Sequence, residues 1–159
     1  MKGNDKLLDT LNALLSDELT AINQYMVHAE MCGNWKYKRM HDMVQKRAMQ
    51  EMRHAEKLIG RILFLEGTPD VNNLNTVNIG KTVEEQIRFD RLSEEEAILS
   101  YNKAIRLASD VSDNGTFELL QGILHDEENH LDSLDAQLNQ IKQMDIKHFL
   151  ADQALEVAE

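Results

Sequence analysis

The 159-residue sequence has few of the residues that end helices or cross-link a chain, with one proline, one cysteine and seven glycines. The single cysteine, Cys32, excludes an internal disulfide and any four-cysteine zinc or rubredoxin-like module. The single proline, Pro69, leaves long stretches free to be helical, because proline inside a helix removes a backbone hydrogen bond. These scarcities favour a helical protein whose chemistry does not depend on thiols.

Long apolar runs are also missing. No stretch approaches the ~20 consecutive apolar residues that a membrane-spanning helix needs, and the N-terminal residues contain no apolar signal region. We therefore expect a cytoplasmic protein that does not bind membranes. Positive charge is scarce too, and the formal net charge of −11 argues against nucleic-acid binding and suits a protein that attracts cations.

Hydrophobic residues recur at three- and four-residue spacing over four long segments, which predicts four helices. The first runs from about residue 5 to 34, the second ends near residue 65, the third begins near residue 83, and the fourth follows a break at residues 112–115. A short fifth helix is predicted from Ile146 to about Val157. The segment from Glu66 to about Thr82 loses helical periodicity and is rich in asparagine and glycine, which indicates a long connection.

Two antiparallel helical hairpins joined by one long crossover form the ferritin-like variety of four-helix bundle. A simple up-down-up-down bundle ranks second, because it does not need a connection long enough to run the length of a helix. The chain has the usual size of one domain, so we expect a single all-α, ferritin-like domain over residues 1–159.

Each of the four long helices carries a glutamate on the apolar stripe that should face the interior of the bundle. Glu94, for example, lies seven residues after Ile87 and four before Ile98. Burying several unpaired charges costs several kcal/mol per group or forces protonation. No buried lysine or arginine is in phase to neutralise these acids, whereas two divalent cations would balance four carboxylates.

Two of the glutamates are each followed three residues later by a histidine, in E-M-R-H at 51–54 and E-E-N-H at 127–130. This spacing places the carboxylate and the imidazole of each motif on the same helical face. Each of the four glutamates and both histidines has an equivalent 76 positions away, and so does Tyr25, whose equivalent is Tyr101. This spacing indicates a duplicated helical hairpin and a site with pseudo-twofold symmetry.

Together these residues predict a dinuclear metal site, the constellation known from ferritin-like di-iron and di-manganese carboxylate proteins. Oxygen-rich ligation with one imidazole for each ion favours iron or manganese, because structural zinc more often occupies a closed site of cysteine and histidine. The candidate metal ligands and catalytic residues are Glu18, Glu51, His54, Glu94, Glu127 and His130.

Stretches over essentially the whole chain resemble bacterioferritins: M-K-G, E-L-T-A-I-N-Q-Y, E-M-R-H-A-E, R-I-L-F-L-E-G-T-P, N-I-G and D-E-E-N-H. By this resemblance Glu18 and Glu94 are terminal ligands, the glutamates of the two E-x-x-H motifs bridge the two irons, and the histidine of each motif binds one iron. The resemblance implies a ferroxidase that oxidises Fe(II) with O2 or H2O2. It also implies a homo-oligomeric shell of about twenty-four subunits that stores ferric mineral.

The resemblance further implies a haem of the b type, shared by two subunits at a twofold axis with Met52 as an axial ligand. Met49, Met52, Ile59 and Leu63 form a second apolar stripe on the second helix. A helix with two apolar faces needs a partner beyond its own bundle. A ferredoxin-like protein is the implied electron donor.

Several further residues have expected positions. Gln50 and Asp126 each precede an E-x-x-H motif and are expected to accept a hydrogen bond from an imidazole across the bundle. Tyr25 and Tyr101 either hydrogen-bond the site carboxylates or lend an electron there, or they fill the core with their hydroxyls paired elsewhere, and these alternatives stay open. Cys32 is expected to be partly buried. The other histidines lack acidic partners in phase and are interpreted as surface or interface residues: His28, His41, His125 and His148.

Two other functions share part of this pattern. A rubrerythrin-like protein that reduces peroxide has the same six-residue core, but it normally adds a cysteine-ligated iron domain, which one cysteine cannot supply. A non-catalytic helical scaffold is the second alternative. It would tolerate leucine at all four glutamate positions, and the acids that are present argue against it.

Overall fold

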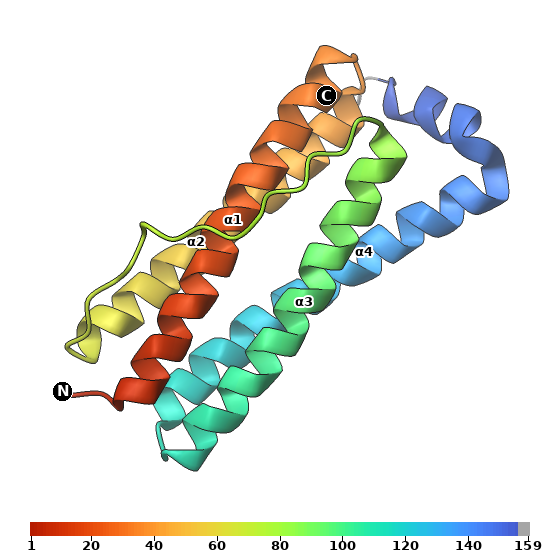
Figure 1. Cartoon of the computed structure of the whole chain (residues 1–159). Helices are drawn as coiled ribbons and strands as arrows, with labels where there is room; N and C mark the ends of the chain where they lie inside the picture. The colour runs from red at the N-terminus through yellow and green to blue at the C-terminus, as the bar shows by residue number, and fades with distance from the viewer. Residues whose placement is uncertain (156–159) are drawn as a thin grey trace.

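The computed structural model describes residues 1–155, and these form four long helices. They are α1 (Asp5–Asn34), α2 (Lys38–Phe64), α3 (Val83–Asp110) and α4 (Asn114–Gln153). Figure 1 shows α1 with α2 and α3 with α4 as two antiparallel hairpins packed side by side. None of the described residues lies in a strand, and the predicted all-α, four-helix architecture is confirmed. No helix among residues 1–155 is both long and apolar enough to cross a membrane.

Polar side chains begin three of the helices. At the start of α1 the side chain of Asn4 accepts a hydrogen bond from the backbone N–H of Leu7 at 3.1 Å. Thr82 and Asp113 accept the equivalent bonds at the starts of α3 and α4. Such caps pair backbone donors that a helix cannot satisfy within its first turn. The starts of these three helices are therefore determined by the local sequence.

Residues 65–82 form the connection between the hairpins, and Figure 1 shows this segment running beside α1 from one end of the bundle to the other. Because it returns the chain to the end where α2 began, α3 runs in the same direction as α2. Four of its backbone N–H groups donate hydrogen bonds of 2.8–3.1 Å to side chains spaced along α1. The pairs are Asp70 with Asn12, Asn75 with Thr20, Asn78 with Gln24, and Gly80 with His28.

The buried apolar residues form two clusters, one towards each end of the bundle. The first cluster is rich in leucine and includes Leu15 of α1 and Ile123 of α4. The second cluster includes Tyr25 of α1 and Leu134 of α4. On α1 and α4 alike, the predicted site residues lie between a member of one cluster and a member of the other. A polar layer therefore separates the two halves of the core.

The C-terminal part of α4 bends at Asp145, whose φ of 70° and ψ of 151° are not helical. The side chain of Asp145 accepts a hydrogen bond from the N–H of Ile146, and Figure 1 shows the chain changing direction here. Beyond the bend, Phe149 is buried in the second cluster. The residues beyond the bend are helical as far as Gln153, but the predicted fifth helix from Ile146 to Val157 is not confirmed at its C-terminal end, because Val157 lies outside the described residues.

Candidate metal centre

One glutamate from each helix extends into the layer between the two hydrophobic clusters. Glu18 on α1, Glu51 on α2, Glu94 on α3 and Glu127 on α4 are each at most 3% exposed. Each is held there because the neighbouring residues of its stripe are packed in the core. The structure thus brings four carboxylates together where an apolar core would have none.

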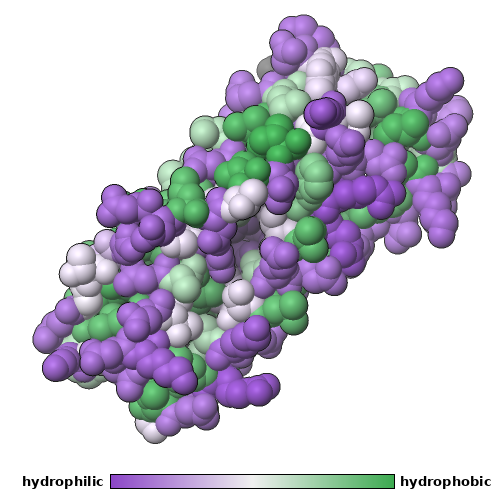
Figure 2. All heavy atoms as spheres, in the orientation of Figure 1, coloured by the Kyte–Doolittle hydropathy of each residue, from purple (hydrophilic) through white to green (hydrophobic). Residues whose placement is uncertain are grey.

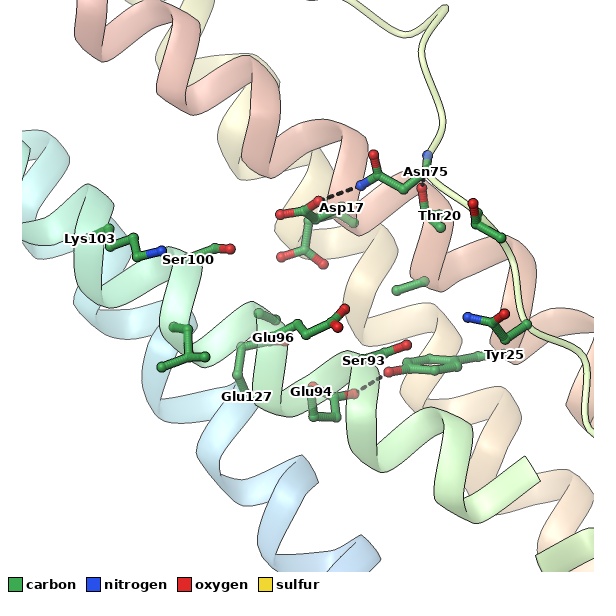
Figure 3. A pocket seen from close by; sticks show the side chains of 16 residues that line it. Asp17, Thr20, Tyr25, Asn75, Ser93, Glu94, Glu96, Ser100, Lys103 and Glu127 are labelled. Carbon is green, nitrogen blue, oxygen red and sulfur yellow. Dashed lines mark hydrogen bonds between the residues drawn. The ribbon is translucent and has the colours of Figure 1, made fainter. Parts of the chain in front are cut away.

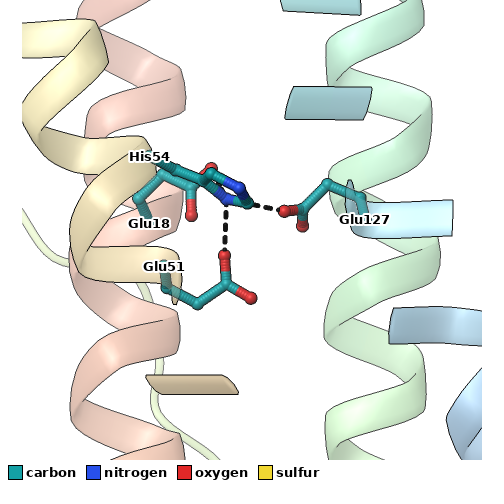
Figure 4. A group of neighbouring side chains, drawn as sticks. All are labelled: Glu18, Glu51, His54 and Glu127. Atoms are coloured by element: carbon teal, nitrogen blue, oxygen red, sulfur yellow. Dashed lines mark hydrogen bonds and ion pairs between the residues drawn. The ribbon is translucent and has the colours of Figure 1, made fainter. Parts of the chain in front are cut away.

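The two histidines of the E-x-x-H motifs lie among these carboxylates. His54 Nδ1 is 2.9 Å from Glu51 Oε2 and 2.9 Å from Glu127 Oε1, as Figure 4 shows, and 3.6 Å from Glu18 Oε1. His130 Nδ1 is 3.0 Å from Glu51 Oε1 and 3.4 Å from a carboxylate oxygen of α3. All six candidate ligands therefore converge.

The ligand atoms fall into two overlapping groups, and within each group all the atoms lie within 4.8 Å of one another. The Glu18 group consists of Glu18, Glu51, His54 and Glu127. The Glu94 group consists of Glu51, Glu94, Glu127 and His130. The glutamates of the two E-x-x-H motifs belong to both groups. Two neighbouring cations bridged by two shared carboxylates require this arrangement.

The second ring nitrogen of each histidine is held from outside the two groups. Asp126 Oδ2 lies 3.0 Å from His54 Nε2, and Gln50 Oε1 lies 2.9 Å from His130 Nε2. Both hydrogen bonds expected from the sequence are present. Since these oxygens accept the proton on Nε2, each Nδ1 faces the centre and would bind a cation that displaces any proton held there.

Four buried polar atoms at the centre have no hydrogen-bond partner. They are Glu51 Oε1, Glu94 Oε2, Glu127 Oε1 and His130 Nδ1. Buried polar atoms are nearly always paired, because leaving one unpaired costs about 1–3 kcal/mol. All four are electron-pair donors; Glu127 Oε1 lies 2.9 Å from His54 Nδ1 and Glu51 Oε1 lies 3.0 Å from His130 Nδ1, but neither contact has the geometry of a hydrogen bond. The donor set therefore fits hard or borderline divalent cations, which would satisfy all four atoms at once.

Protonation at the centre is strongly perturbed. Burial raises the pKa of Glu51 and Glu127 well above the usual glutamate value, and repulsion between the neighbouring carboxylates adds to this. Burial acts to lower the pKa of His54, but its contacts with Glu127, Glu18 and Glu51 outweigh this effect and raise the pKa well above its usual value. Without cations the centre holds protons, and bound cations would replace them.

Two buried tyrosines are hydrogen-bonded to the terminal glutamates. The hydroxyl of Tyr25 on α1 donates to Glu94 Oε1 on α3 at 2.6 Å, as Figure 3 shows, and the hydroxyl of Tyr101 on α3 donates to Glu18 on α1. The two bonds are equivalent under the 76-residue spacing, because each one joins a tyrosine on α1 or α3 to a glutamate on the other of these two helices. This settles the choice between hydrogen bonding and core filling that the sequence left open, because each tyrosine both fills the core and binds a carboxylate.

A cleft of about 380 Å³ between α1 and α3 connects the centre with the surface beside the crossover. Its inner wall includes Glu18, Glu94 and Glu127, and Figure 3 shows Asp17 and Glu96 in the same cleft. Burial raises the pKa of Asp17 to about 6, against the effect of the Asn75 amide that donates to it. The cleft gives a small cation a route lined with carboxylates.

A second group of buried polar residues was not anticipated. Gln24, His28, Arg47 and Asp90 are each at most 5% exposed. His28 Nδ1 lies 2.8 Å from Asp90 Oδ1, and its Nε2 accepts the N–H of Gly80 at 3.0 Å. The interpretation of His28 as a surface residue is therefore wrong. So is the expectation that no arginine is buried near the carboxylates.

This buried group was missed because its members belong to different segments of the chain. His28 finds its partners on α3 and on the crossover, which the phase of α1 alone does not reveal. One signal was available, since Arg47 and Asp90 each lie four residues before a site glutamate and so share its helical face. Cys32 is fully buried rather than partly buried, and burial raises the pKa of its thiol to about 12.

Met52 lies outside the centre, on a solvent-facing side of α2, with 39% of its surface exposed. Met26, Met49 and Leu63 are also exposed, by about half of their surface. Figure 2 shows the face with the crossover in front, where hydrophilic residues predominate and hydrophobic residues form separate groups.

Comparison with known proteins matches residues 8–144 to the model of the ferritin-like domain. A bacterioferritin of Mycolicibacterium paratuberculosis is 36% identical over 151 residues, which are 95% of either chain. A bacterioferritin of Rhodobacter capsulatus is 37% identical over 139 residues, covering 87% of this chain and 86% of the relative. A bacterioferritin of Brucella melitensis is 36% identical over the same length. The matches therefore extend over both hairpins and the crossover.

Proposed function

We propose a function from one premise: this chain belongs to the ferritin family and, within it, to the bacterioferritins. We propose that the protein stores iron and acts as a ferroxidase, oxidising Fe(II) with O2 or H2O2 at the six-residue centre. The observation that carries this proposal is the pair of overlapping ligand groups with four unpaired buried atoms. Similarity to bacterioferritins also favours this function over the rubrerythrin-like one.

In this proposal each group binds one Fe(II) as substrate. Glu51 and Glu127 are shared by both ions, Glu18 and Glu94 each bind one ion, and His54 and His130 complete the two sets. Each Fe(II) gives up one electron, so that a pair of ions supplies the two electrons which, with two protons from solvent, reduce O2 to hydrogen peroxide or reduce H2O2 to two water molecules. Carboxylates can bind through one or both oxygens, which lets the centre follow the change in metal charge without moving its helices.

The cleft between α1 and α3 serves in this proposal as a route for Fe(II). Asp17 and Glu96 line it together with three of the site glutamates, and Lys103 is its only basic lining residue. A narrow cleft lined by charges of one sign raises the local concentration of ions of the opposite sign. The net charge of −11 acts in the same direction over the whole subunit.

The assembly extends the proposal beyond one chain. We propose that residues 1–159 form a single domain and that about twenty-four copies close into a cytoplasmic shell that holds ferric mineral. The exposed apolar residues of α1 and α2, among them Met26, Met49 and Met52, suit an interface between two subunits. Two copies of the Met52 thioether would hold a b-type haem there, which supplies one-electron chemistry for a ferredoxin-like donor.

Rapid mixing of the assembled, metal-free protein with Fe(II) and O2 tests the proposal. Glu18→Ala or Glu94→Ala should abolish the fast phase of Fe(III) formation, because each removes a ligand from one group. Glu95→Ala, next to Glu94 but exposed, is the matched control and should oxidise Fe(II) at the wild-type rate. Size-exclusion chromatography should give the same assembled mass for all the proteins. A wild-type rate in the Glu18 or Glu94 variant would show that the site assignment is wrong.

A further inference from the structure

The centre is nearly symmetric, but its surroundings are not. The 76-residue spacing relates the six ligands and the two tyrosines in pairs, and it relates Arg47 to Ile123 and Asp90 to Leu14. Arg47 and Asp90 are charged and buried beside one half of the centre, whereas Ile123 and Leu14 are buried apolar residues of the first hydrophobic cluster. The 76-residue spacing therefore relates the ligands of the two halves but not the buried residues around them.

The Arg47 side chain lies close to the Glu94 half of the centre. Its guanidinium carbon is 5.6 Å from the centre of the Tyr25 ring, and the hydroxyl of that ring donates to Glu94 Oε1 at 2.6 Å. Burial acts to raise the pKa of Glu94, whereas His130 and the positive charge of Arg47 act to lower it. One tyrosine ring therefore separates a permanent positive charge from a ligand of the Glu94 group.

Arg47 and Asp90 form a loose buried ion pair without a hydrogen bond from Nη1 of the arginine. Arg47 Nη1 is 3.5 Å from Asp90 Oδ2 and has no hydrogen-bond partner. Asp90 Oδ1 instead faces Gln24, which donates to it at 2.9 Å, and His28. His28 is neutral in this arrangement, because its Nε2 accepts the N–H of Gly80 and only Nδ1 carries a proton towards Asp90.

We propose that Arg47 makes the two cation positions unequal, so that the Glu18 group binds a divalent cation more tightly than the Glu94 group and fills first. The tyrosine bonds exist in both halves and cancel in the comparison. The position equivalent to Arg47 in the other half is Ile123, which has no charge, so the effect of the guanidinium is not balanced there. In a protein interior its repulsion of a divalent cation is weakly screened. The inference rests on the proposed function only in that both groups bind divalent cations.

Crystals of the assembled protein equilibrated with one Co(II) per subunit give a direct test, because anomalous scattering reports the occupancy of each position separately. We expect the Glu18 group to hold most of the metal, in keeping with an affinity difference of about tenfold. Arg47→Met should clearly reduce the inequality, and what remains reflects the carboxylate of Asp126 behind His54 against the neutral amide of Gln50 behind His130. Arg47→Lys, which keeps the charge, should preserve the inequality.

Two further variants separate charge from packing. Asp90→Asn leaves the positive charge of Arg47 unopposed and should increase the inequality, the opposite direction to Arg47→Met. General damage to the second hydrophobic cluster would instead move both variants in the same direction. Ile123→Met, at the position equivalent to Arg47, is the matched control, and its two cation positions should have the same Co(II) occupancies as in the wild-type protein. If Arg47→Met does not assemble, Arg47→Met with Asp90→Asn contains no unpaired buried charge and should also reduce the inequality.

Equal occupancy in the wild-type protein, or an unchanged inequality in Arg47→Met, would overturn the inference while leaving the ferroxidase proposal intact. Absence of Co(II) from both positions would overturn the ferroxidase proposal itself. The two failures are thus distinguishable in one experiment, and neither depends on an activity measurement.

Discussion

The two ends of the bundle are built differently although a duplicated hairpin generates both. The first cluster, at the end where α1 begins, is packed almost entirely from aliphatic side chains such as Leu11 and Leu58. At the other end the apolar cluster shares the interior with Gln24, His28, Arg47 and Asp90. Aliphatic packing tolerates small shifts, whereas a buried hydrogen-bonded network fixes the positions of its members. We infer that the first end mainly stabilises the fold and the second positions Tyr25, Glu94 and the crossover.

Among substitutions that test this difference between the two ends, the largest loss of stability is expected at Asp90. Asp90→Ala should lower the free energy of unfolding of the metal-free protein by about 3–5 kcal/mol, because it leaves Arg47 and the donors of His28 and Gln24 without their acceptor. Urea denaturation followed by circular dichroism measures this change. Asp110→Ala, an exposed aspartate of α3, is the matched control and should leave the midpoint unchanged. If Asp90→Ala and Asp110→Ala lowered the free energy of unfolding equally, the buried network would not contribute to stability.

At the first end, Leu58→Ala should cost about 2–4 kcal/mol, because Leu58 is fully buried and its removal leaves a cavity. The loss should not alter the relative occupancy of the two cation positions, since no charge changes. Leu99→Ala removes an exposed leucine of α3 and serves as the control in the same denaturation experiment. A changed occupancy ratio in Leu58→Ala would show that apolar packing also tunes the centre, and the division between the two ends would fail.

The layer between the two ends should depend on pH and metal together. Folding raises the pKa of Glu51 and Glu127 above the usual value of 4.5, so the folded protein retains protons that the unfolded chain releases. In the metal-free protein this contribution to stability is therefore fully present below pH 4.5 and is lost as pH rises through the raised pKa values. Bound cations replace the protons and add about 2.7 kcal/mol at a hundredfold excess over the dissociation constant.

Calorimetry at two pH values tests this expectation. The difference in melting temperature between Co(II)-loaded and metal-free protein should be larger at pH 8 than at pH 5.5. Glu51→Gln cannot ionise at a shared position and should make the melting temperature of the metal-free protein less dependent on pH. Should the loaded and metal-free proteins differ equally at both pH values, the protons held by the centre do not contribute to its stability.

The sequence predicted some of these features better than others. The four helices and the convergence of the six side chains follow from apolar stripes, which each helix carries independently of its neighbours. The buried network could not be read in the same way, because Asp90 looks like a surface acid until His28 and Arg47 pack against it. The sequence predicted a short fifth helix from Ile146 but not the form of the junction, in which Asp145 at φ of 70° bends the chain between two helical stretches of α4. Metal binding by the six residues stays a prediction.

The smallest expected effect concerns the crossover, which is attached differently at the two ends. Near the first end the N–H of Asp70 donates to the partly exposed side chain of Asn12, whereas near the second end the N–H of Gly80 donates to fully buried His28. A bond that water can reach opens more readily than one inside the core. Amide hydrogen exchange should therefore be faster at Asp70 than at Gly80. Asn12→Ala should speed exchange a few-fold at Asp70 and leave Gly80 unchanged, because the buried network holds the second end independently. If Gly80 were accelerated as much as Asp70, the crossover would open as one unit, and the distinction between the two ends would not extend to it.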